Sequence, residues 1–145
     1  MTPEAPSLPA GTARGGKALR VFLWVAQVLL AIGFGMAGFM KLTTPYADMT
    51  AKAAWARAIP EALIRFIGVA EVAGVLGIIL PAATRIKPAL TPLAATGFVV
   101  IMVLASALHL RLGEPPLANV ILGGLAVFVA WGRFLRAPIS PRGTA

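Results

Sequence analysis

Two ionisable side chains lie in long apolar runs, and they are the residues best suited to chemistry. Glu71 is the only formal charge between Arg65 and Arg85, in a segment otherwise rich in apolar residues and glycine. His109, the single histidine of the chain, closes another apolar run. A charged side chain at membrane depth costs about 2.5–3.5 kcal/mol on insertion scales. Glu71 therefore needs a partner, a proton or a ligand, and it is a candidate functional group.

The composition is that of a membrane protein. Hydrophobic residues make up 59% of the 145 residues and charged residues 12%, whereas about 25% of a soluble domain is charged. The net charge of +8 is spread singly between apolar runs, so we expect lipid head groups and no nucleic acid as partners. The absence of cysteine excludes thiol catalysis, and a single histidine excludes a bis-histidine haem within the chain and argues against a zinc site.

Four apolar runs predict four spanning helices, because each is long enough to cross a hydrocarbon core of about 30 Å. The expected fold is an all-α polytopic membrane bundle of four helices. Pro60 begins the second span and Pro81 closes it, and a short helix is expected in the interface at residues 49–59. The four runs are residues 21–40, 61–80, 89–110 and 117–135.

Domain organisation and orientation follow from the same pattern. Residues 1–18, rich in proline, glycine and basic residues, predict a disordered tail. Residues 19–136 form the transmembrane domain, and residues 137–145 form a second tail. Eight of the 13 Lys and Arg residues fall on the side of the two tails and five on the other side. The excess of basic residues on cytoplasmic loops predicts that both termini are cytoplasmic.

Depth in the membrane predicts which polar residues can meet. If the second span enters at Pro60, Glu71 lies ~16 Å deep, near the midplane. Gln27 lies within about 5 Å of that depth, so these two residues are the expected direct pair. His109 is expected in a separate group at the outer surface. The candidate members of that group are Lys41, Asn119, Arg111 and Glu114.

Each candidate also has a plain structural interpretation. Glu71 could be a protonated acid that fixes a tight helix contact, since Gly68 and Gly74 share its face. His109 could be an interfacial anchor or a cap, in place of a proton carrier or a hydrogen-bond donor to a quinone carbonyl.

Five other side chains have structural interpretations of the same kind. Lys41 and Asn119 could contact head groups or turns before any ligand. The face that carries Phe98 and Met102 is interpreted as packing, and Arg65 is expected to snorkel to the outer head groups.

Four motifs together resemble the DoxX-like family of small bacterial membrane proteins. They are AGFMKL at residues 37–42, IGVAEVAG at 67–74, LP followed by a basic turn at 80–88, and ALHL at 107–110. The resemblance covers about residues 19–136 and implies a four-helix bundle in the bacterial cytoplasmic membrane. Lys41, Glu71 and His109 resemble the family's recurring polar positions, and Asn119 is added for its location alone.

The resemblance implies a quinone or another lipophilic small molecule as ligand, because namesakes of the family are linked to a membrane thiosulfate:quinone oxidoreductase. The chain would be an accessory subunit, with no built-in cofactor and with a soluble redox partner supplying electrons. Its lack of cysteine departs from relatives that handle thiols. The residues predicted to bind ligand are Glu71, His109, Gln27, Lys41 and Asn119, with no metal ligand and no assigned catalytic residue.

Two alternatives stay open beside the quinone hypothesis. In a small transporter or proton-coupled carrier, Glu71 would titrate and a homo-oligomer would build the path. In a ligand-free scaffold, small-residue stripes on the first and fourth runs would pack against other helices. An independent enzyme is the least supported class, because the sequence has no Ser/His/Asp set and no nucleotide-binding loop.

Overall fold

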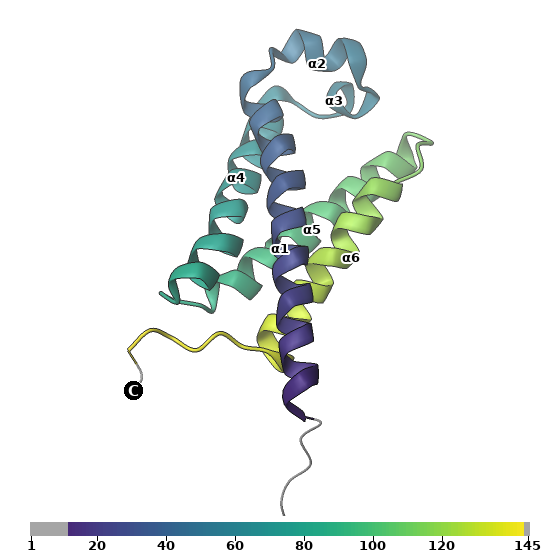
Figure 1. Cartoon of the computed structure of the whole chain (residues 1–145). Coiled ribbons are helices and arrows are strands. Elements are labelled where there is room, and N and C mark those ends of the chain that lie inside the picture. The colour runs from purple at the N-terminus through teal and green to yellow at the C-terminus, as the bar shows by residue number, and fades with distance from the viewer. Residues whose placement is uncertain (1–11, 144–145) are drawn as a thin grey trace, which may run out of the picture.

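The computed structural model describes residues 12–143, and every regular element in that range is helical (Figure 1). Large apolar side chains such as Phe22, Met36 and Phe66 are exposed on the outer faces of the helices, as expected where lipid takes the place of water. Together with the length of the helices, this makes the chain an integral membrane protein with an all-α fold. The helical segments long and apolar enough to span a membrane are Gly16–Thr43, Glu61–Thr84, Leu90–Arg111 and Leu117–Arg136.

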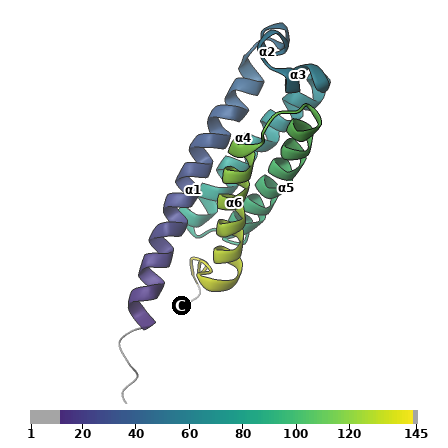
Figure 2. The same ribbon diagram turned by 90° about the vertical axis from the view of Figure 1, so that its right-hand side faces the viewer.

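The four long helices pack as a bundle in which α1 contacts α4 and α6, and α5 contacts α4 and α6. The start of α1, the α4–α5 turn and η1 lie at one end, which we call the termini end (Figures 1 and 2). The helices α2 and α3 and the α5–α6 turn lie at the other, the cap end. The elements in order are α1 (Thr12–Thr43), α2 (Tyr46–Lys52), α3 (Ala54–Ala58), α4 (Glu61–Thr84), α5 (Leu90–Arg111), α6 (Leu117–Trp131) and the π-helix η1 (Gly132–Arg136).

Stacked aromatic rings fill the middle of the bundle. The ring of Phe34 in α1 lies on that of Phe98 in α5, with centroids 3.8 Å apart and planes within 5°. Gly74 in α4 makes room for this stack, because a Cβ atom there would lie 2.5 Å from the Phe98 ring. The face of α5 that carries Phe98 and Met102 is thus part of the packed core, as its apolar spacing predicts.

Two helix boundaries differ from the sequence-based expectation. Helix α1 begins at Thr12, so part of the predicted tail is helical, and residues 1–11 of that tail lie outside the described residues. Helix α4 continues through Pro81 to Thr84, although the sequence predicts that Pro81 closes it. Proline is tolerated in spanning helices because neighbouring side chains satisfy freed backbone groups. The carbonyl that Pro81 itself leaves without a donor is that of Gly77, and the Gln27 amide donates to the next carbonyl, that of Ile78, at 2.8 Å.

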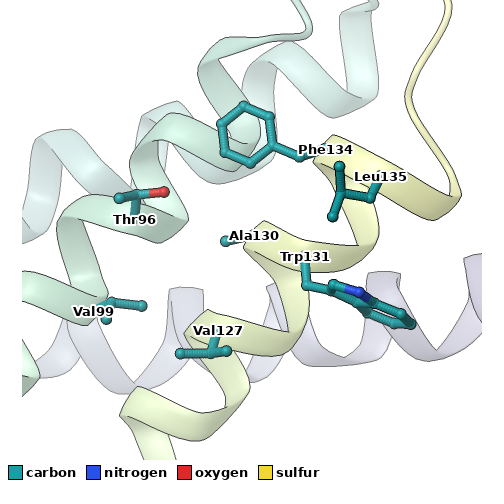
Figure 3. A pocket seen from close by; sticks show the side chains of 7 residues that line it. All are labelled: Thr96, Val99, Val127, Ala130, Trp131, Phe134 and Leu135. Atoms are coloured by element: carbon teal, nitrogen blue, oxygen red, sulfur yellow. The ribbon is translucent and has the colours of Figure 1, made fainter.

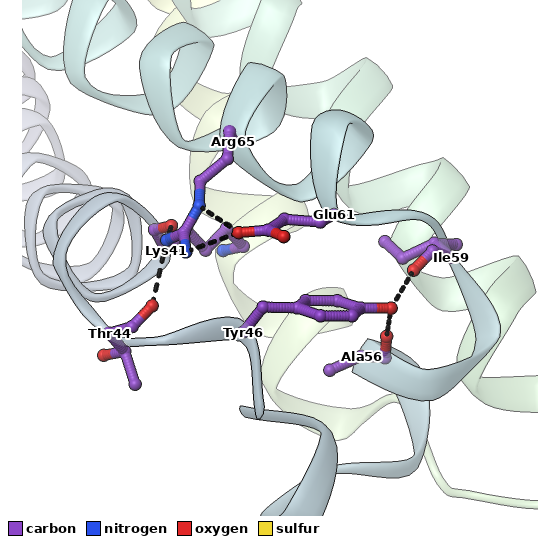
Figure 4. Close-up of polar contacts among 7 residues, drawn as sticks. All are labelled: Lys41, Thr44, Tyr46, Ala56, Ile59, Glu61 and Arg65. Atoms are coloured by element: carbon purple, nitrogen blue, oxygen red, sulfur yellow. Dashed lines mark hydrogen bonds and ion pairs between the residues drawn. The ribbon is translucent and has the colours of Figure 1, made fainter. Parts of the chain in front are cut away.

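The cap end is covered by two short helices where the sequence predicts one. Met49 of α2 and Ala56 of α3 are buried with Ile64, which anchors both helices on the start of α4. The Tyr46 hydroxyl lies 3.5 Å from the Ala56 carbonyl and 3.3 Å from the Ile59 carbonyl, so it ties α2 to the end of α3 (Figure 4).

Candidate functional site

A buried ion pair joins α1 to α4 near the cap end. The Lys41 ammonium donates to both carboxylate oxygens of Glu71, at 2.9 and 3.0 Å. The Glu71 side chain is 2% exposed and that of Lys41 13%. Glu71 therefore has its charged partner within the chain. The expected Glu71–Gln27 pair is wrong, because the flexible Lys41 stem carries its ammonium away from the depth at which its backbone lies.

Two glycines place the partners of this ion pair. A Cβ atom on Gly38 of α1 would lie 3.0 Å from the Gly68 carbonyl oxygen and 3.1 Å from the Glu71 Cβ. A Cβ atom on Gly68 would lie 3.0 Å from the Lys41 Cβ. Small residues at such a crossing let two backbones approach closely in lipid. The tight helix contact predicted around Glu71 is confirmed, and Lys41 reaches the acid across it.

A second layer of charge lies above the ion pair, toward the cap. The Arg65 guanidinium donates to the Lys41 carbonyl, and to the Thr44 carbonyl at 3.0 Å, and it pairs with Glu61 at 2.9 Å (Figure 4). These carbonyls lie at the C-terminal end of α1, where the helix dipole makes a cation favourable. Arg65 thus binds the end of α1, and its expected contact with the outer head groups stays a prediction. The Lys41 ammonium also lies 5.8 Å from the centre of the Trp55 ring.

Gln27 belongs to a different cluster at the termini end. Its side-chain oxygen accepts a 2.7 Å hydrogen bond from Nε of Arg133, and its amide donates to α4. Arg133 is 5% exposed, and its guanidinium faces the Trp24 ring at 5.7 Å. In the sequence, Arg133 is only one of the eight basic residues on the side of the two tails. Its spacing from Ala126 and Ala130 could have placed it, because residues three or four apart share a helix face.

His109 contacts one of its four expected partners, the acid Glu114. Its Nδ1 atom is 2.7 Å from a carboxylate oxygen of Glu114, which follows in the α5–α6 turn. The two side chains are 25% and 40% exposed. Lys41 is committed to Glu71 instead. Of the five residues predicted to bind ligand, Lys41 and Glu71 contact each other, whereas Gln27 and His109 have other partners.

Because the His109–Glu114 contact is partly exposed, we expect Glu114→Gln to lower the free energy of unfolding by less than about 1 kcal/mol. Thermal unfolding in detergent measures this, with Asp48→Asn, a change at another exposed acid of the cap end, as the control. A loss of several kcal/mol would instead identify the pair as a structural centre.

A groove on the lipid-facing side of the bundle runs between α5 and α6. Toward the termini end it has a volume of about 520 Å³ and is lined by Trp131, Phe134 and other apolar side chains (Figure 3). Toward the cap end it has a volume of about 390 Å³, and Ser106 and Asn119 are among its lining residues. Val99 and Val127 line both parts, which therefore adjoin each other. Asn119 is the predicted site residue that lines it.

Comparison with known proteins assigns the chain to a family. The sequence model of the DoxX-like family matches residues 25–132, which include all four long helices in whole or in large part. Neither the curated proteins nor the solved structures give a match. The matched range also contains Lys41, Glu71 and His109, the polar residues that carry the resemblance in the sequence. The match covers well over half of the chain, and the protein belongs to the DoxX-like family.

Proposed function

We propose that this protein binds a quinone, or a lipophile with a similar carbonyl head, in the groove between α5 and α6. The groove is the observation that carries the proposal, because its apolar wall faces the membrane and suits an isoprenoid or acyl tail. Asn119 and Ser106, near its cap end, supply an amide and a hydroxyl that can donate hydrogen bonds to a carbonyl oxygen. The buried Lys41–Glu71 pair is left with a structural role.

In this proposal the protein is an accessory subunit of a membrane redox system. The chain has no cysteine, so the electrons would come from a soluble partner and not from a thiol of its own. The proposed location is the bacterial cytoplasmic membrane, with both termini in the cytoplasm. The positive-inside rule supports this orientation, because eight of the 13 Lys and Arg residues belong to the termini end. Two of the other five, Lys41 and Arg65, are held in ion pairs.

We expect short-chain ubiquinone or menaquinone analogues to stabilise the purified protein in detergent. A ligand at 100 times its Kd adds about 2.7 kcal/mol to the stability of the form that binds it. Val127→Phe should abolish this gain, because Val127 lies where the two parts of the groove meet. Asn119→Leu should weaken the gain from quinones and leave the gain from a plain hydrocarbon tail.

The matched control is Val100→Phe, the same substitution on the neighbouring helix α5. Val100 is 54% exposed and Val127 51%, and Val100 lines neither part of the groove. Thermal shift measurements on both variants compare an equal change in volume at equal exposure. If no quinone stabilises the wild type, or if both variants respond as the wild type does, quinone binding in the groove is refuted.

A ligand-free scaffold is the second candidate, and one observation favours it. Glu71 and Lys41 satisfy each other fully, so the most deeply buried acid needs no ligand. Under this alternative no lipophile changes the melting temperature, and the same thermal shift panel decides between the two functions.

A further inference from the structure

Arg133 carries a buried guanidinium whose Nη1–Nη2 edge has no firm hydrogen-bond partner. Its Nε atom is fixed by Gln27 at 2.7 Å. The other two nitrogens are held poorly: Nη1 lies 3.5 Å from the Ala137 carbonyl oxygen, and Nη2 has no hydrogen-bond partner among the described residues. The Nη1–Nη2 edge is one of the forks with which arginine binds carboxylate or phosphate with two parallel hydrogen bonds.

The termini end offers this arginine no counter-charge among residues 12–143. The described acids, Asp48, Glu61, Glu71 and Glu114, belong to the cap-end half of the bundle or are paired there. Glu4 lies outside the described residues. Arg20 is close enough for its positive charge to act on Arg133, which adds repulsion. The nearest described charges thus make an anion from outside more favourable.

A buried charge is costly unless it is paired and hydrogen-bonded. The contacts of Arg133 with Gln27 and with the Trp24 ring orient the guanidinium without neutralising it. The elements at this end also carry basic residues: Arg85 and Lys87 follow α4, Arg136 ends η1, and the Arg142 N–H donates to the Arg85 carbonyl. An anion that approaches this end therefore meets a field of one sign and a guanidinium held in position by its Nε atom.

We propose that Arg133 is the anchor of an anion site at the termini end, which binds a phosphate group through its Nη1–Nη2 edge. Because Nη2 is closed to solvent, the phosphate would have to displace the Ala137 carbonyl. One of its oxygens would replace the long contact of Nη1 with Ala137, and a second would take the vacant donor of Nη2. The phosphate could belong to the head group of an anionic lipid, or it could be a soluble phosphate. This site is separate from the α5–α6 groove, because Arg133 lies against α1 and does not line the groove.

The experiment measures the melting temperature of the full chain in neutral detergent with three additions. These are phosphatidylglycerol, phosphatidylcholine as the zwitterionic lipid, and sodium phosphate against sodium chloride at equal ionic strength. We expect phosphatidylglycerol to raise the wild-type melting temperature by about 2–4 °C over phosphatidylcholine. A rise with phosphatidylglycerol alone identifies a lipid head group, and a rise with inorganic phosphate identifies a soluble anion.

Arg133→Gln should abolish the rise. Arg136→Gln is the matched control. Arg136 is an exposed arginine three residues away, and its substitution removes the same charge. Gln27→Glu places a carboxylate on Arg133 from within the chain, so it should also abolish the rise even if Arg133→Gln fails to fold. Equal rises in wild type and Gln27→Glu overturn the proposal. So does the lack of any rise in the wild type.

Discussion

Glu71→Gln is expected to lower the free energy of unfolding by about 3–5 kcal/mol, the cost of leaving one partner of a buried ion pair without the other. The reason is that Glu71 is 2% exposed and accepts two hydrogen bonds from Lys41, which then faces an uncharged amide. Lys41→Met should cost a similar amount, since it strands the acid. Equilibrium unfolding in mixed detergent micelles measures both variants.

The double variant Lys41→Met/Glu71→Leu separates a buried charge from general damage to the α1–α4 contact. Replacing both partners of a buried pair by apolar residues is often neutral or stabilising, so the double variant should be more stable than either single variant. Additive losses would show that the ion pair contributes little and that packing carries the effect. Because the pair does not line the α5–α6 groove, Glu71→Gln should leave any quinone-dependent stabilisation in place.

Gly38→Leu is expected to lower stability by about 1–3 kcal/mol or more through overpacking. The new side chain would begin 3.0 Å from the Gly68 carbonyl and 3.1 Å from the Glu71 Cβ, where backbone cannot yield easily. The separation of α1 from α4 should also lengthen the Lys41–Glu71 contact. Thermal unfolding in detergent measures the loss.

Gly97→Leu is the matched control for this glycine. It lies in α5, is exposed, and a Cβ atom there would meet nothing within 4 Å. Leucine is a better helix former than glycine by about 0.5–1 kcal/mol, so Gly97→Leu should be neutral or stabilising. If both variants lose the same stability, the close approach of α1 and α4 is not the cause.

The sequence predicts the number and type of helices well, because the lengths of apolar runs and the breaks between them reflect the thickness of a bilayer. It predicts one helix end poorly at Pro81, because whether a proline stops a helix depends on neighbours such as Gln27 that the local sequence does not reveal. The tight contact around Glu71 follows from Gly68 on the same face and is confirmed by the structure.

The polar partners could not be predicted from depth alone. Depth estimates locate backbone atoms, whereas a lysine side chain carries its charge several ångströms along the bundle, so Lys41 meets Glu71 and Gln27 does not. Arg133 escapes notice for a related reason: a basic residue at the end of an apolar run is normally a head-group contact. The signal that could have revealed its inward side chain is the helix face that it shares with the buried Ala126.

Two of the polar links between helices differ greatly in the length of chain that they close, and this bears on how the protein is made. Lys41 and Glu71 are 30 residues apart, so both have been synthesised once the second spanning helix has left the ribosome. Gln27 and Arg133 are 106 residues apart, and their bond must wait for the last turn of the last helix. Because chains emerge from the N-terminus onward, α1 and α4 can join early in biogenesis as a hairpin whose buried acid is already paired. Gln27 stays without its arginine until insertion is nearly finished.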